Sequence, residues 1–157
     1  MRAIDLYSGI GGWSLGLELN NIKVIRSYEW WDQAVETSNR NLLKKESVCD
    51  VRKMSFSDLK NKKIDIVVGS PPCTQFSYSN RGGSGDLEDG IIDLYQFFKC
   101  VKEIKPKFWA MENVPRVANV IAKECQKGGY LYEFKNIIDK GFVEVLNMRE
   151  YGVPQKR

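Results

Sequence analysis

Residues 3–19, AIDLYSGIGGWSLGLEL, combine a strand pattern, a glycine-rich turn and a helical pattern. Ala3–Ser8 is apolar and strand-like, whereas Trp13–Leu19 has the pattern of a helix. Glycines at a strand-to-helix turn let the backbone approach a ligand closely, and this turn contains Gly9, Gly11 and Gly12. The stretch predicts the first strand–helix unit of an α/β protein; a tight turn that binds nothing is the alternative.

The same alternation continues along the chain. Further strands are predicted at Lys23–Glu29, near Ser47–Val48, and at Ile64–Gly69, Phe108–Glu112 and Phe142–Met148. Helices are predicted at Asp32–Leu43, with Asp32 as N-cap, and at Ile91–Ile104 and Arg116–Gln126. This order predicts an α/β fold, with a mostly parallel sheet and helices on both faces, in one domain over residues 1–157. Ligands of such sheets bind beyond the carboxyl ends of the strands.

Composition excludes several kinds of site. The chain has no histidine, so a Ser-His-Asp triad, a Cys-His pair and a histidine metal site are impossible. Its four cysteines never form C-x-x-C, so we expect neither a metal site nor a disulfide framework. The net charge of +4 suits an anionic partner without requiring one. Without a signal peptide or an apolar run near the roughly 18 residues of a membrane span, we expect a cytoplasmic protein with no membrane partner.

Two strand ends carry residues suited to catalysis. The strand before VVGSPPCTQFSYS, residues 67–79, leads through two prolines to Cys73, and the prolines stiffen the chain that presents the sulfur. Glu112 ends another strand between apolar Met111 and Val114, so we expect a desolvated carboxyl that carries a proton near pH 7. The alternatives are an inert buried thiol for Cys73, and an ion pair or helix N-cap for Glu112.

Three further positions suit an adenine nucleoside. Glu29 ends the second strand about 20 residues after the glycine turn, the usual place for a carboxylate that binds ribose hydroxyls. Trp30 offers a flat platform for adenine, and Asp50 can accept from an exocyclic amine. Core packing is the alternative for Trp30, although we expect Trp31 to be the core residue of the two.

Five segments in order, DLYSGIGG, EWWDQA, GSPPCTQFS, ENV and YGVPQKR, resemble the cytosine carbon-5 methyltransferases. Enzymes of this family methylate DNA with S-adenosylmethionine, as in bacterial restriction–modification systems. The resemblance covers residues 3–157 and implies a Rossmann-like methyltransferase fold. It also implies double-stranded DNA as partner and a bacterial, archaeal or phage origin.

The resemblance assigns roles to the candidate residues. Cys73 resembles the thiolate that adds to carbon 6 of a flipped cytosine. Glu112 resembles the residue at ring nitrogen 3 and the exocyclic amine, and Arg157 matches an arginine that holds the carbonyl oxygen. The positions that match the cofactor pocket are Tyr7, Gly9, Gly11, Gly12, Glu29, Trp30, Asp50, Val51, Pro72 and Leu94.

The sequence departs from the family pattern at two places. Thr74 replaces the usual glutamine after the cysteine, and the chain ends at Arg157 inside the motif QKR-x-R. We therefore expect a C-terminally incomplete domain that lacks the target-recognition region and the segment closing the cofactor pocket. We expect such a chain to be a truncated enzyme, or one half of a split enzyme completed by a second chain, and to be inactive alone.

The glycine-rich stretch Thr74–Gly90 is predicted to be a mobile loop that closes behind the flipped base, with Ser79 filling the gap that the base leaves.

Three other functions remain open. A tRNA methyltransferase carries the same motifs, and a non-catalytic regulatory subunit is a second alternative, against which Cys73 and Glu112 argue. A dinucleotide-dependent oxidoreductase is disfavoured by the glycine spacing and by Pro-Pro-Cys.

Overall fold

A computed structural model describes residues 1–42, 46–74, 76 and 87–154. The chain divides into two compact units, Met1–Val114 and Pro115–Arg157, and each is described by itself. Within the described ranges, no helix combines the length and the apolar character needed to cross a membrane. One functional domain over residues 1–157 stays a prediction.

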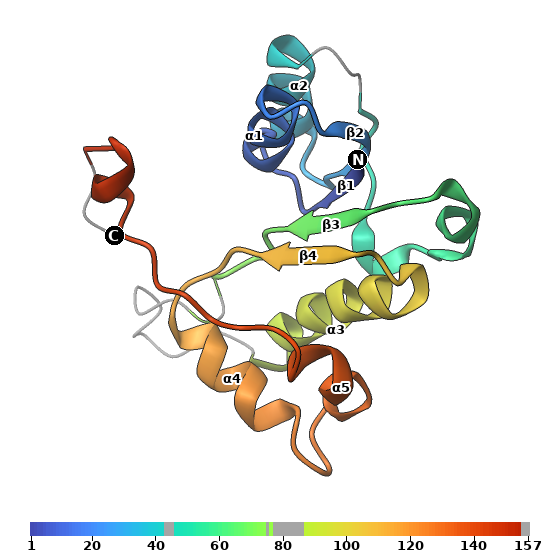
Figure 1. Cartoon of the computed structure of the whole chain (residues 1–157), viewed down its shortest axis with the longest axis vertical. Coiled ribbons are helices and arrows are strands. Elements are labelled where there is room, and N and C mark those ends of the chain that lie inside the picture. The colour runs from blue at the N-terminus through green and yellow to red at the C-terminus, as the bar shows by residue number, and fades with distance from the viewer. Residues whose placement is uncertain (43–45, 75, 77–86, 155–157) are drawn as a thin grey trace. The chain divides into compact units, whose positions relative to one another are not determined.

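The first unit contains a four-stranded parallel sheet (Figure 1). Its strands are β1 (Arg2–Leu6), β2 (Lys23–Tyr28), β3 (Ile66–Gly69) and β4 (Phe108–Met111). The strand order is β2-β1-β3-β4, so the chain first builds outward from β1 and then returns to its other side. The direction of winding therefore reverses between β1 and β3, and ligands of open α/β sheets bind at such a reversal.

Helices cover both faces of this sheet, as the sequence predicts. The helices of the unit are α1 (Gly12–Leu19), α2 (Asp32–Asn41) and α3 (Leu87–Ile104). On one face, Trp13 and Leu17 of α1 pack against a cluster of buried strand residues: Ala3, Val24, Ile66 and Val68. On the other face, Phe97 and Phe98 of α3 meet Trp109 of β4 edge to face, with ring centroids 6.2 and 5.7 Å apart. Trp109 pairs with Val67, which points away from the face of Ile66 and Val68 because strand residues alternate.

Three details of the first unit correct the sequence predictions. Asp32 is the first residue of α2 and not its N-cap, a position held by Trp31; its carboxylate accepts from the N–H of Gln33 at 2.8 Å. The strand near Ser47–Val48 is a single bridge between Val48 and Glu29. The predicted loop Thr74–Gly90 is too long, because α3 begins at Leu87; Glu88 and Asp89 suit the positive end of a helix dipole. Most of that loop, residues 75 and 77–86 with Ser79, lies outside the described residues.

The second unit is built from short helices: α4 (Arg116–Glu124), α5 (Lys135–Ile138) and the 3-10 turns Tyr132–Phe134 and Met148–Tyr151. The predicted strand Phe142–Met148 is wrong, since residues 142–147 have no regular structure. A strand exists only through hydrogen bonds to a neighbour, and none pairs with this stretch in the described part of the unit. Its apolar side chains are accordingly exposed, Phe142 by 87% and Val143 by 73%.

Candidate active site

The glycine turn after β1 is held by the carboxylate of Glu29. Gly9 and Gly11 have φ of 55° and 91°, and the N–H of Gly11 closes the turn on the carbonyl of Ser8 at 2.9 Å. One oxygen of Glu29 accepts from the N–H of Gly9 at 2.8 Å, and the other accepts from the N–H of Trp31 at 2.9 Å. Glu29 therefore joins the exits of β1 and β2, and each of its oxygens has a further lone pair for a ligand hydroxyl.

The two tryptophans after Glu29 are both exposed. Trp30 is 63% and Trp31 54% exposed, so the expectation that Trp31 belongs to the core is wrong. Core packing is also excluded for Trp30. An indole exposed beside the glycine turn suits a flat ring as ligand.

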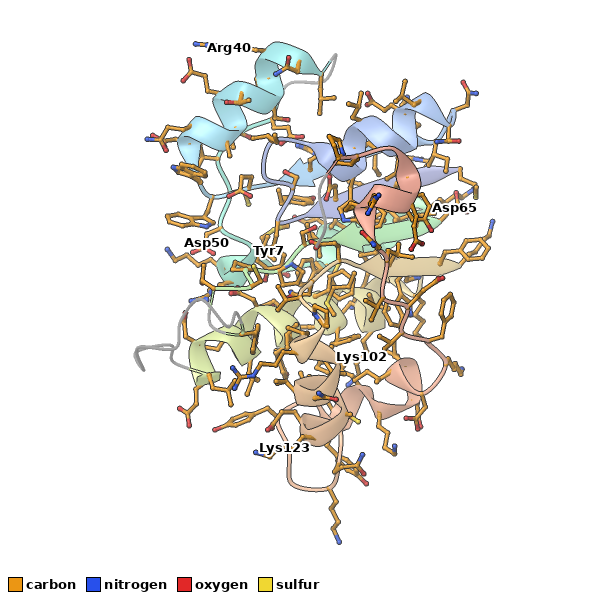
Figure 2. The ribbon with its side chains drawn as sticks, turned by 90° about the vertical axis from the view of Figure 1, so that its left-hand side faces the viewer. Tyr7, Arg40, Asp50, Asp65, Lys102 and Lys123 are labelled. Atoms are coloured by element: carbon orange, nitrogen blue, oxygen red, sulfur yellow. The ribbon has the colours of Figure 1, made fainter. Side chains whose placement is uncertain are left out.

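Asp50 lies next to this turn, on the segment bridged to Glu29. The N–H of Cys49 donates to the carbonyl of Glu29 at 2.7 Å, and the 3-10 turn η1 (Val51–Lys53) follows. Asp50 caps that turn: its carboxylate accepts from the N–H of Arg52 at 3.0 Å and pairs with Lys53 at 3.2 Å. Figure 2 shows Asp50 and Tyr7 at one end of the sheet and Asp65 at the other.

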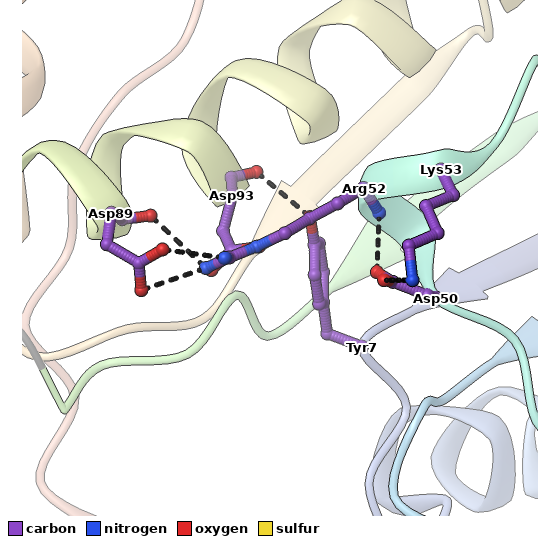
Figure 3. A network of polar contacts seen from close by, with 6 residues as sticks. All are labelled: Tyr7, Asp50, Arg52, Lys53, Asp89 and Asp93. Atoms are coloured by element: carbon purple, nitrogen blue, oxygen red, sulfur yellow. Dashed lines mark hydrogen bonds and ion pairs between the residues drawn. The ribbon is translucent and has the colours of Figure 1, made fainter.

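Tyr7 and Arg52 both bind α3 at Asp93 (Figure 3). The hydroxyl of Tyr7 donates to the carbonyl of Asp93 at 3.2 Å, and the guanidinium of Arg52 binds both carboxylate oxygens of Asp93 at 2.8 and 2.7 Å. Burial raises the pKa of the Tyr7 hydroxyl, and the Asp93 charge raises it further. Hydrogen bonds to Asp93 and then Asp89 raise the pKa of Arg52. Sequence reasoning missed Arg52, Asp89 and Asp93, although the two acids lie four residues apart on one helix face.

Cys73 stands three residues beyond Ser70, on the segment that leaves β3. The carbonyl of Pro71 accepts from the side-chain amide of Asn113 at 2.8 Å, which ties the ENV segment after β4 to the Pro-Pro-Cys segment. On the other side of the sulfur, the N–H of Phe76 donates to the carbonyl of Cys73 at 2.9 Å, and Phe76 is fully buried. Cys73 itself is half-buried and lies between these two hydrogen-bonded points.

Glu112 is exposed, contrary to the expectation of a desolvated carboxyl. Its backbone N–H continues the sheet by donating to the carbonyl of Gly69 at 3.0 Å. β4 is the outermost strand of the described sheet, so no further strand covers its end, and apolar sequence neighbours alone do not bury the side chain. Glu112 is not a helix N-cap either, because that position of α4 belongs to Pro115.

The remaining candidates differ in accessibility. Pro72 is half-buried, Gly12 begins α1, and Val51 is 2% exposed. Leu94 is fully buried in the third turn of α3 and not at a loop junction; its cofactor role stays a prediction. Arg157 lies outside the described residues. The structure thus gathers the glycine turn, Glu29, Asp50 and the Pro-Pro-Cys segment around the ends of β1, β2 and β3.

Comparisons with known proteins agree with this arrangement. The sequence profile described as C-5 cytosine-specific DNA methylase matches residues 1–157. Type II methyltransferase M.HindV of Haemophilus influenzae is 34% identical over 100% of this chain and 50% of its own length. M.DdeI of Desulfomicrobium norvegicum is 36% identical over 100% of this chain and 39% of its own length. The chain therefore spans half or less of these curated relatives.

Solved structures share the fold. A putative DNA modification methyltransferase encoded within an Escherichia coli prophage superposes with a TM-score of 0.69 at 26% identity, over 100% of this chain and 44% of that one. The Dnmt2 methyltransferase of S. pombe has a TM-score of 0.68 at 20% identity, over 100% of this chain and 46% of that one, and supports the fold alone. The predicted Rossmann-like methyltransferase fold and the family resemblance are both confirmed. The chain belongs to the C-5 cytosine-specific DNA methylase family.

Proposed function

We propose that this chain carries the cofactor-binding and nucleophile-bearing part of an enzyme that methylates carbon 5 of cytosine in DNA. The family match and the type II methyltransferases among its relatives support this function. The observation that carries it is the hydrogen bond from Asn113 to the carbonyl of Pro71. It couples the two segments that bear Cys73 and Glu112, where neighbouring strands β3 and β4 end side by side.

The residues around the glycine turn fit S-adenosylmethionine. Glu29 would hold the ribose, the exposed Trp30 and the buried Val51 would flank the adenine, and Asp50 would accept from the adenine amine. The carboxylates of Glu29 and Asp50 are oriented by backbone N–H donors and keep lone pairs for a ligand. When bound, S-adenosylmethionine supplies an electrophilic methyl group on a sulfonium.

Cys73 would supply the nucleophile. Its thiolate adds to carbon 6 of a cytosine rotated out of the duplex, while Glu112 gives a proton to ring nitrogen 3 and Arg157 holds the carbonyl oxygen. Carbon 5, now part of an enamine, takes the methyl group. Loss of the carbon-5 proton to a base restores the ring double bond and releases the thiolate, and ring nitrogen 3 returns its proton to Glu112. Anchors on both sides of Cys73 favour attack from one fixed direction.

Trapping with 5-fluorocytosine tests the nucleophile, because fluorine cannot leave as a proton and the sulfur–carbon bond persists. The chain, joined after Arg157 to the half of M.HindV that it does not match, is incubated with S-adenosylmethionine and random-sequence duplexes containing 5-fluorocytosine. We expect a denaturation-resistant adduct that Cys73→Ser abolishes. Cys49→Ser is the matched control, since Cys49 is also half-buried, and it should leave the adduct intact.

Two outcomes would contradict the proposal. An adduct that persists in Cys73→Ser assigns the nucleophile to another residue. No adduct at all, in a hybrid protein that binds S-adenosylmethionine, argues against methyl transfer to cytosine.

A further inference from the structure

One face of α3 binds Arg52 of the neighbouring 3-10 turn. Asp89, Asp93 and Gln96 are spaced by four and three residues, which places them on one side of the helix. The guanidinium of Arg52 binds the Asp93 carboxylate at 2.8 and 2.7 Å and the Asp89 carboxylate at 2.6 and 3.2 Å. The side-chain amide of Gln96 donates to the carbonyl of Arg52 at 3.0 Å. Both the side chain and the backbone of Arg52 are therefore fastened to α3.

Arg52 in turn orients Asp50. The N–H of Arg52 donates to one carboxylate oxygen of Asp50 at 3.0 Å, so the direction of that carboxylate follows the placement of the turn. Lys53 pairs with the other oxygen of Asp50, but its side chain is 84% exposed, and this ion pair does not connect Asp50 to α3. The path from α3 to Asp50 thus runs through Arg52 (Figure 3).

A contribution to stability is a weak explanation for the cluster of Arg52, Asp89 and Asp93. Asp93 is 2% exposed, and removing a carboxylate from water costs free energy that a paired arginine offsets only in part. Apolar residues of similar volume often replace such pairs without loss of stability. Asp93 also accepts, through its carbonyl, the hydroxyl of Tyr7 at the exit of β1. The cluster therefore fastens two separate segments to α3: Tyr7 directly, and the segment of Asp50 through Arg52.

We propose that Arg52 is a positioning residue for cofactor recognition: held by Asp93 and Asp89, it aims the Asp50 carboxylate at the exocyclic amine of adenine. This inference rests on the proposed function, since it assumes that S-adenosylmethionine binds beside Asp50. It predicts that Arg52 sets the discrimination between adenine and a purine that lacks the amine, without touching the ligand.

The test compares two ligands and two variants by calorimetry. S-adenosylhomocysteine carries the amine, whereas S-inosylhomocysteine has a carbonyl oxygen in its place. We expect the wild-type chain to prefer S-adenosylhomocysteine by roughly tenfold or more, the effect of one hydrogen bond to a charged group. Arg52→Ala should reduce this preference to less than about threefold. Arg40→Ala is the matched control, because Arg40 forms an exposed ion pair with Glu36 on α2, and it should keep the full preference.

Arg52→Ala leaves Asp93 buried without its partner, so a second variant guards against misfolding. Arg52→Met with Asp93→Leu removes both charges together and should lose the preference in the same way, with folding checked by circular dichroism. If either folded variant lowers the affinity for both ligands by the same factor, so that the preference is unchanged, Arg52 has only a structural role and the inference is wrong. If the wild-type chain binds neither ligand, the cofactor assignment itself fails, which is a separate result.

Discussion

Asp5 provides a pH-dependent test of the structure, because it is a fully buried acid within β1. One of its oxygens accepts from the hydroxyl and the N–H of Ser14 at 2.7 and 3.2 Å, and the other has no hydrogen-bond partner in the described part of the structure. Burial raises the pKa of Asp5 from 3.8 to about 7; the Ser14 hydroxyl opposes this shift, and the charges of Glu46 and Glu29 add to it.

The sign of the pH effect follows from proton binding. Between pH 4 and 7 the unfolded chain has lost the Asp5 proton and the folded chain keeps it, so the folded state binds more protons. The free energy of unfolding therefore falls as pH rises through this interval. From 3.8 to about 7, at about 1.4 kcal/mol per pH unit, the contribution of Asp5 falls by about 4 kcal/mol.

Asp5→Asn removes this dependence while keeping the shape of the side chain and an oxygen for Ser14. We expect variant and wild type to have similar free energies of unfolding near pH 4. By pH 8 the variant should be more stable by about 4 kcal/mol. Urea unfolding followed by circular dichroism, at intervals from pH 4.5 to 8.5, measures the difference.

An exposed acid supplies the control. Asp32→Asn, at the start of α2, removes a carboxylate that is already exposed. Its free energy of unfolding should therefore stay within about 0.5 kcal/mol of the wild-type value across the pH range. A difference between Asp5→Asn and wild type that is the same at pH 4.5 and pH 8.5 would refute the argument, because Asp5 would then not hold its proton in the folded state.

Three further substitutions test the packing that shapes the site. Tyr7→Phe keeps the ring but loses the 3.2 Å hydrogen bond to the Asp93 carbonyl, so the free energy of unfolding should fall by about 1 kcal/mol; an unchanged urea midpoint would show that this bond contributes nothing. Gly69→Ala would place a methyl group 2.7 Å from the carbonyl oxygen of Leu6 and should cost about 1–3 kcal/mol. Gly16→Ala, with open space at its Cβ inside α1, should instead stabilise the chain by about 1 kcal/mol, and equal effects at the two glycines would contradict the packing.

Local pattern was sufficient to predict most of the elements from sequence. The apolar runs of β1 to β4 and the helical periodicity of α3 are local features of the sequence. The positions of these elements could therefore be predicted to within a few residues. The glycine turn and the Pro-Pro-Cys segment were also predictable as strand ends. Glycine widens and proline narrows the conformations open to the backbone wherever they occur.

Burial was less predictable, because it depends on what packs from elsewhere in the chain. Met111 and Val114 suggested a desolvated Glu112, yet no strand lies beyond β4 in the described sheet and the carboxyl is exposed. Trp31 was expected in the core from its type alone, yet it is 54% exposed at the start of α2. The apolar pattern of residues 142–148 suits a strand, but a strand also requires a hydrogen-bonded neighbour.

By itself, then, the sequence determined the alternation of strands and helices, the residues at the strand ends and the family. Only the tertiary structure decided the strand order β2-β1-β3-β4, which places the glycine turn beside the Pro-Pro-Cys segment. It alone brought Arg52 to Asp93, 41 residues away, and Asn113 to Pro71, 42 residues away. Propensity and periodicity act over one or two turns of chain, whereas these pairings depend on how whole elements pack, which no short stretch encodes.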